Sequence, residues 1–111
     1  MKKAITISAL LLISGSAFAA FNGPEVKSIS TVHDALNAKD DSFVVLTGNI
    51  TQSLGNEVYI FKDSTGEIQV EIEHEAWMGQ DISPQDNIVI RGEVDSEWTS
   101  TQIDAHSIQK L

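Results

Sequence analysis

Carboxylates crowd one stretch of the chain, from Phe61 to Glu75, which reads FKDSTGEIQVEIEHE. It holds five acidic residues and one histidine, side chains that can transfer protons, bind a metal ion or attract cations. Glycoside hydrolysis needs two carboxyl groups on either side of the scissile bond, with environments that separate their pKa values. A metal site needs ligands that converge on one point. The arrangement of the carboxylates therefore decides among these chemistries.

Residue types alternate through this stretch. Ile68, Val70 and Ile72 alternate with polar residues, which predicts a strand with one apolar face and one wet face. Glu67, Glu71 and Glu73 then form a row on the wet face. Carboxylates that stand side by side in water have no apolar surroundings to separate their pKa values. We therefore predict no catalytic pair here.

Other chemistries have little support in the residue types. The chain has no cysteine, which excludes thiol catalysis and zinc sites built on cysteine. It has no H-E-x-x-H, calcium-loop or G-x-S-x-G motif, and its three histidines, at 33, 74 and 106, are scattered. We predict no catalytic residue, no dedicated metal site and no cofactor. Loose association of divalent cations with the glutamates of the predicted strand stays open.

The first nineteen residues have the pattern of a secretory signal. A basic start at 1–3 precedes an apolar run of ten residues at 4–13, and Ala17-Phe18-Ala19 gives a small-x-small cleavage site. Ten apolar residues are too few for a spanning helix, which needs about 20. We predict cleavage after about Ala19, a periplasmic location and no membrane anchor.

Cleavage would leave a strongly acidic chain of 92 residues, enough for one small domain. Lys2 and Lys3 would leave with the signal, so five basic residues would face sixteen acidic ones, and the net charge would change from −9 to −11. Such a surface repels phosphate backbones and attracts cations. We predict no nucleic-acid partner, while solubility alone is another reason for a negative surface.

The rest of the chain predicts one short helix followed by strands. Thr31 is a predicted N-cap for a helix that ends near Ala38, with Val32, Ala35 and Leu36 on its apolar side. Strands are predicted at 42–53, 57–63, 67–73, 87–96 and 101–109, with a glycine bend at Gly48, a hairpin loop of three to five residues at 63–66 and one helical turn near 75–78. The predicted division is a signal peptide at 1–19, an irregular lead-in and short helix at 20–41, and a barrel at 42–111.

Five strands with an interruption after the third predict an all-β fold with one short N-terminal helix, a five-stranded OB-fold-like barrel. A five-stranded sandwich fragment is the alternative, but its open edges would need protection. The predicted core consists of Phe61, Ile68, Val70, Ile72, Ile88 and Ile90, with Trp77 as a plug at one end of the barrel. Both faces of the predicted strand 57–63 are apolar, so the sequence does not say which one is exposed.

Several short sequence motifs resemble those of one protein family. VVLTGNI, YIFKDSTGEIQVEI, W-x-G, NIVIRGEVD and a closing I-x-A-x-x-I resemble the bacterial OB-fold (BOF) proteins, the YgiW/YdeI stress-tolerance group. The resemblance covers about Val26 to Gln109 plus the signal, and it is most specific from Phe61 to Ile72. It implies an OB-type barrel, a periplasmic location, a role in tolerance of cationic peptides, peroxide and acid, and no known catalytic residues.

Barrels of this type bind ligands across strands two and three and the adjoining loops. Those positions give the candidate ligand-binding residues, which are Tyr59, Glu67, Glu71, Glu73 and Trp98. Trp98 lies in a polar turn, where its ring would attract a cation or, alternatively, fold back to cap the barrel. We predict a non-enzymatic binding protein that meets a cationic peptide or another small cationic or envelope-derived ligand through an acidic face. The alternative is a protein-interaction subunit that docks on an envelope enzyme or complex.

Overall fold

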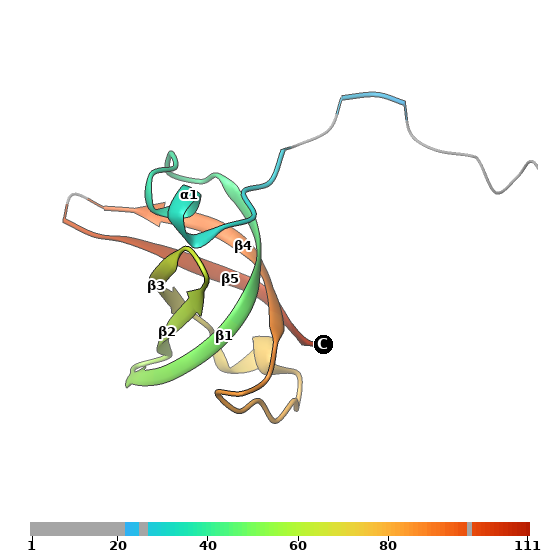
Figure 1. Cartoon of the computed structure of the whole chain (residues 1–111), viewed down its shortest axis with the longest axis vertical. Helices are drawn as coiled ribbons and strands as arrows, with labels where there is room; N and C mark the ends of the chain where they lie inside the picture. Colours follow the sequence, from blue (N-terminus) through green and yellow to red (C-terminus); the bar gives the residue numbers. More distant parts are fainter. Residues whose placement is uncertain (1–21, 25–26, 98) are drawn as a thin grey trace, which may run out of the picture.

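Five strands close into a barrel in the order β1-β2-β3-β5-β4 (Figure 1). The computed structural model describes residues 22–24, 27–97 and 99–111. Its elements are α1 (Val32–Leu36), β1 (Phe43–Gly55), β2 (Val58–Asp63), β3 (Gly66–Glu71), the 3-10 helix η3 (His74–Trp77), β4 (Ile88–Ser96) and β5 (Thr101–Lys110). Among the paired strands of these described residues, β3 and β5 pair in parallel and the other pairs are antiparallel. The predicted all-β barrel with one short N-terminal helix is confirmed, and the sandwich alternative is wrong because the sheet closes on itself.

The barrel closes because β1 changes partner at Gly48. Residues 43–48 pair with β4, and residues 49–55 pair with β2. A Cβ atom at Gly48 would collide with the carbonyl oxygen of Lys62 and lie 2.9 Å from the ring of Phe61. Only glycine lets the two backbones approach this closely. The bend that the sequence predicts at Gly48 is the point where the strand crosses from one neighbour to the other.

The core fills the barrel with aliphatic side chains and one phenylalanine. All six predicted core residues, Phe61, Ile68, Val70, Ile72, Ile88 and Ile90, are buried. Val32 and Ala35 of α1 are buried as well, whereas Leu36 is 41% exposed, so its predicted place on the apolar side is wrong. The helix ends at Leu36, and the chain then turns so that Ala38 packs against the core instead.

Asp63 fastens α1 to the β2–β3 turn. The turn has two loop residues, Ser64 and Thr65, because Asp63 pairs directly with Gly66, so the predicted longer loop is wrong. The Asp63 carboxylate accepts hydrogen bonds from the N–H of Thr65 (2.7 Å), the hydroxyl of Thr65 (2.6 Å), the N–H of Gly66 (3.2 Å) and the N–H of Val32 (2.9 Å). The Thr65 hydroxyl oxygen in turn accepts from the N–H of His33 at 2.9 Å. The predicted cap of α1 is also present, since Thr31 Oγ1 accepts from the N–H of Asp34 at 3.1 Å.

The two ends of the barrel are closed by different segments. At the α1 end, Ile29 bridges to β1 through hydrogen bonds with Phe43 (2.9 Å) and Val45 (2.8 Å), so the lead-in is not irregular throughout, as the sequence suggests. At the other end, Trp77 of η3 packs edge-on against Tyr59, with ring centroids 5.3 Å apart. Both rings pack against the core and remain partly exposed, so Trp77 covers the barrel end as predicted without being fully buried.

Candidate functional site

The candidate residues from the sequence lie on more than one surface. Glu67 and Glu71 alternate with buried residues of β3 and point outward. Tyr59 lies on the inner side of the sheet, opposite Val70 and against Trp77, so it does not share a face with the two glutamates. Glu73 follows the end of β3 and precedes η3, so the predicted strand to residue 73 is too long. Trp98 lies outside the described residues.

Three carboxylates from three adjacent strands form a row across the outer wall, here called the acidic row. Glu71 of β3 pairs with Asp104 of β5, and Asp104 pairs with Glu93 of β4. The residues directly before and after each carboxylate in the sequence are buried, so all three side chains point outward. Directly opposite residues have Cβ atoms about 5 Å apart. Glu71 belongs to the predicted site, whereas Asp104 and Glu93 were missed because only the register between strands reveals them.

No lysine or arginine of the described residues forms an ion pair with the acidic row. The row contacts the imidazole of His106, which is charged only when protonated and whose Nε2 lies 3.6 Å from Glu93 Oε1. Both side chains are partly exposed, so this contact is a weak one. The row therefore keeps most of its negative charge available to a ligand.

A groove of about 790 Å³ lies between η3 and the second half of β5 and is here called the η3–β5 groove. It exists because the pairing of β3 with β5 ends at Glu71 and Asp104, after which the chain leaves toward η3. Apolar side chains and carboxylates line it together. The lining residues are Glu73, Glu75, Ala76, Met78, Gln80 and residues 104–109. Asp104 belongs to both the row and the groove, so the two features form one continuous surface.

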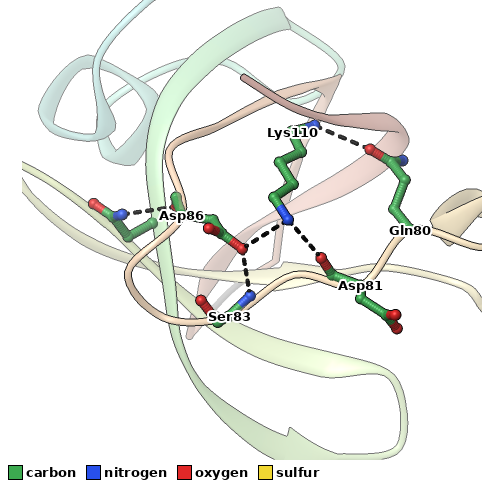
Figure 2. A network of polar contacts seen from close by, with 6 residues as sticks. Gln80, Asp81, Ser83, Asp86 and Lys110 are labelled. Atoms are coloured by element: carbon green, nitrogen blue, oxygen red, sulfur yellow. Dashed lines mark hydrogen bonds and ion pairs between the residues drawn. The ribbon is translucent and has the colours of Figure 1, made fainter.

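A polar network holds the far end of this groove in place (Figure 2). The amide of Gln80 donates to the carbonyl oxygen of Ile108 at 2.8 Å and accepts from the N–H of Lys110 at 3.0 Å. The ammonium group of Lys110 lies 3.5 Å from Asp86 Oδ2 and donates to the carbonyl of Asp81 at 3.1 Å. The hydrogen bond from the N–H of Ser83 to Asp86, together with the nearby Lys110 charge, lowers the pKa of Asp86 against the opposing effect of desolvation. These groups bind one another, so the network fixes the loop before β4 to the end of β5.

Two further hollows lie beside residues that pack the barrel end or hold the β2–β3 turn. One, of about 280 Å³, lies beside Tyr59, Trp77 and Ile82 at the barrel end. The other, of about 630 Å³, lies beside Lys62 and the Asp63 turn, whose carboxylate already has its partners. In the parts of the chain that the structure describes, no three acidic or histidine side chains are arranged to hold a metal ion, and no helix is long and apolar enough to cross a membrane. The row and groove thus form the strongest candidate surface.

Known proteins share both the sequence and the barrel. A family model described as bacterial OB fold (BOF) protein matches residues 14–110. Protein YgiW of Escherichia coli K12 is 37% identical in an alignment that covers 100% of this chain and 98% of YgiW. The calcium-regulated OB-fold protein CarO of Pseudomonas aeruginosa is 34% identical, with 95% of this chain and 92% of CarO covered.

Solved structures agree with this relationship. The structure of the hypothetical protein YgiW from E. coli matches with a TM-score of 0.73 and 39% identity, over 84% of this chain and 99% of that chain. The Stn1–Ten1 complex of Schizosaccharomyces pombe matches with a TM-score of 0.62 at 16% identity, over 81% of this chain and 80% of that chain, which shows the fold alone. The resemblance found in the sequence is thereby confirmed: this chain belongs to the bacterial OB-fold (BOF) family.

Proposed function

We propose that this protein is a non-enzymatic periplasmic binding protein that captures cationic ligands on its acidic row and the adjoining groove, and that it thereby contributes to tolerance of envelope stress. The observation that carries the proposal is the strand register, which places Glu71, Asp104 and Glu93 side by side on the outer wall. The row begins on β3, one of the two strands across which barrels of this type bind ligands. A signal-like segment at 1–19 supports a location outside the cytoplasm.

The register distinguishes a binding surface from a merely soluble one. Solubility needs a net charge of one sign, which scattered carboxylates supply equally well. Like charges directly opposite each other on neighbouring strands destabilise the sheet. The acidic row contains two such repulsive pairs, Glu71 with Asp104 and Asp104 with Glu93. A cationic ligand would relieve both repulsions, which gives the arrangement a use.

The same geometry argues against hydrolysis. A glycosidase holds its two carboxyl groups on either side of a bond, with the substrate between them. The carboxylates of the row instead point outward in parallel from an open wall. They can attract a charge together, but they do not enclose a reacting atom. The proposal is therefore one of binding without catalysis.

A binding titration with matched variants tests the proposal. The probe is a fluorescently labelled oligolysine peptide, followed by anisotropy at low ionic strength. The row variant E71Q/E93Q/D104N removes three charges from the row, and the control variant D34N/D41N/D81N removes three from exposed positions outside the row and groove. Each exposed charge pair contributes up to about 1 kcal/mol, and about 1.4 kcal/mol corresponds to a tenfold change in affinity. Loss of three charges from the row should therefore weaken binding about tenfold or more, whereas the control should bind within about twofold of wild type.

The control separates a local effect from a global one. An equal loss in both variants would mean that net charge alone attracts the peptide. No loss in either would mean that the row takes no part in binding. Either result would overturn the proposed site.

A further inference from the structure

One edge of β5 is uncovered beside the η3–β5 groove. β3 pairs with β5 over three residue pairs only, from Gln69 with Gln102 to Glu71 with Asp104. β5 then continues to Lys110 with β4 on its other side. Over the described ranges, no strand pairs with the β3 side of β5 beyond Asp104. Such an edge presents backbone N–H and C=O groups that can pair with another chain.

Gln80 shows which way these backbone groups point. Its side-chain amide donates to the carbonyl oxygen of Ile108 and accepts from the N–H of Lys110, at 2.8 and 3.0 Å. A backbone C=O and a backbone N–H two residues apart on one edge of a strand are the groups to which a neighbouring strand would bind. The amide of Gln80 therefore stands in for a strand at the far end of the edge, and the stretch nearer to Asp104 is left for a ligand.

The shape of β5 limits how long such a ligand strand can be. A bulge where Arg91 and Gly92 face β5 places His106 between the residues that they pair with, Ser107 and Ala105. His106 and Ser107 are both exposed, whereas Ala105 and Ile108 are buried. Bulges twist a strand and interrupt its ladder. The free edge thus suits a short segment between Asp104 and Gln80, not a long sheet extension.

The lining of the groove selects the side chains of that segment. Glu73, Glu75 and Asp104 supply negative charge, and Ala76 and Met78 supply apolar contact. Met78 is 82% exposed and sits in a left-handed conformation at φ 53° that turns the chain out of η3. A flexible, exposed methionine suits apolar partners of varied shape. Successive side chains of an added strand point to opposite sides, so basic and apolar residues in alternation match this surface.

We infer that the η3–β5 groove binds an extended peptide segment of alternating basic and apolar residues, which adds as a short strand to the free edge of β5. The inference rests on the proposed function, because it specifies the class of cationic ligand and its binding geometry. The carboxylates attract the segment, and backbone hydrogen bonds to β5 hold it in register.

Backbone methylation of the peptide tests the strand pairing separately from the charge. The probe is an end-capped alternating lysine–valine peptide of about seven residues, the length of an ordinary strand. Two derivatives carry N-methyl groups on backbone nitrogens only. One is methylated at the backbone nitrogen of every lysine, and the other at the backbone nitrogen of every valine. In a strand, alternate N–H groups face the same edge, so each derivative blocks one edge and leaves the other free. Charge and side chains are the same in all three peptides.

Binding is followed by the amide resonances of the isotope-labelled mature chain. We expect the unmodified peptide to shift amides of residues 105–108 and 76–80, and one derivative to bind about tenfold more weakly than the other. The variant E73Q/E75Q should weaken binding of the unmodified peptide, whereas the exposed pair D34N/D41N should not. Equal binding of both derivatives, or an equal loss in both, would overturn strand addition. Binding of the unmodified peptide with salt dependence would then still support the proposed function, whereas no binding of any of the three would count against both.

Discussion

Replacing Asp63 with alanine tests whether the β2–β3 turn holds α1 on the barrel. The carboxylate of Asp63 accepts four hydrogen bonds, from two donors of Thr65 and from the N–H groups of Gly66 and Val32. Alanine offers no acceptor, so all four bonds are lost. Val32 is the first residue of α1 and is buried, which makes its N–H the most expensive to leave without a partner.

The expected loss follows from these contacts. A buried donor without its acceptor costs about 1–3 kcal/mol, and each hydrogen bond within the turn contributes about 0.5–1.5 kcal/mol. Asp63 is only half-buried, so water can replace its bonds within the turn, and we expect about 2–3 kcal/mol in total. In a domain of this size each kcal/mol shifts the Tm by about 4–8 °C, so D63A should melt about 10–20 °C below wild type.

Urea denaturation followed by tryptophan fluorescence measures this loss. D63N should fall between D63A and wild type, because the amide keeps one acceptor oxygen but loses the charge. The control is E67A, which removes an exposed carboxylate from the adjacent strand and should stay within about 0.5 kcal/mol of wild type. A D63A protein as stable as E67A would refute the role assigned to the turn.

Three further predictions concern charge and location. Burial alone would raise the pKa of Asp63, but hydrogen bonds from Thr65, Val32 and Gly66 outweigh it and hold the pKa below its ordinary value of 3.8. The stabilisation from Asp63 is therefore present above the unfolded pKa and is lost as the pH falls through the folded pKa. Below about pH 4, the free energy of unfolding should decline less in D63N than in wild type. Equal declines would contradict this. D104N should raise the free energy of unfolding by about 0.2–1 kcal/mol at low salt, and by less at high salt, because it removes two like-charge contacts; a loss of stability would contradict the acidic row. Mass spectrometry of a periplasmic extract should find a mature chain that begins at about Ala20, and an uncleaved chain in the cytoplasm would contradict export.

Local patterns predicted most of the barrel. Alternation identified the strands and placed Ile68, Val70 and Ile72 in the core, because the side-chain period of a strand is visible in one segment. Residue types that favour turns and helix caps likewise identified Asp63 and Thr31, because these signals also lie within one segment. The end of β3 was missed because Ile72 keeps the alternation going, although its N–H bonds to Glu57 and the chain turns directly afterwards.

The candidate surface depended on information that no single segment contains. Tyr59 lies in a strand with apolar residues on both faces, so only its pairing with Val70 and its contact with Trp77 show that it faces inward. The register between Glu71 and Asp104 joins strands far apart in the sequence, and periodicity gives the face of a residue without its cross-strand neighbour. The sequence therefore predicted a line of glutamates along one strand, but neither the acidic row across three strands nor the groove beside it.

The most direct test of cationic capture is the salt dependence of binding to the acidic row. The affinity of the mature chain for the oligolysine peptide is measured at about 0.01 M and about 0.15 M ionic strength, between which the Debye length falls from about 30 to about 8 Å. Wild type should lose about tenfold or more in affinity over this range, and E71Q/E93Q/D104N should bind more weakly and lose less. Equal affinities and equal salt dependence in the two proteins would contradict the account.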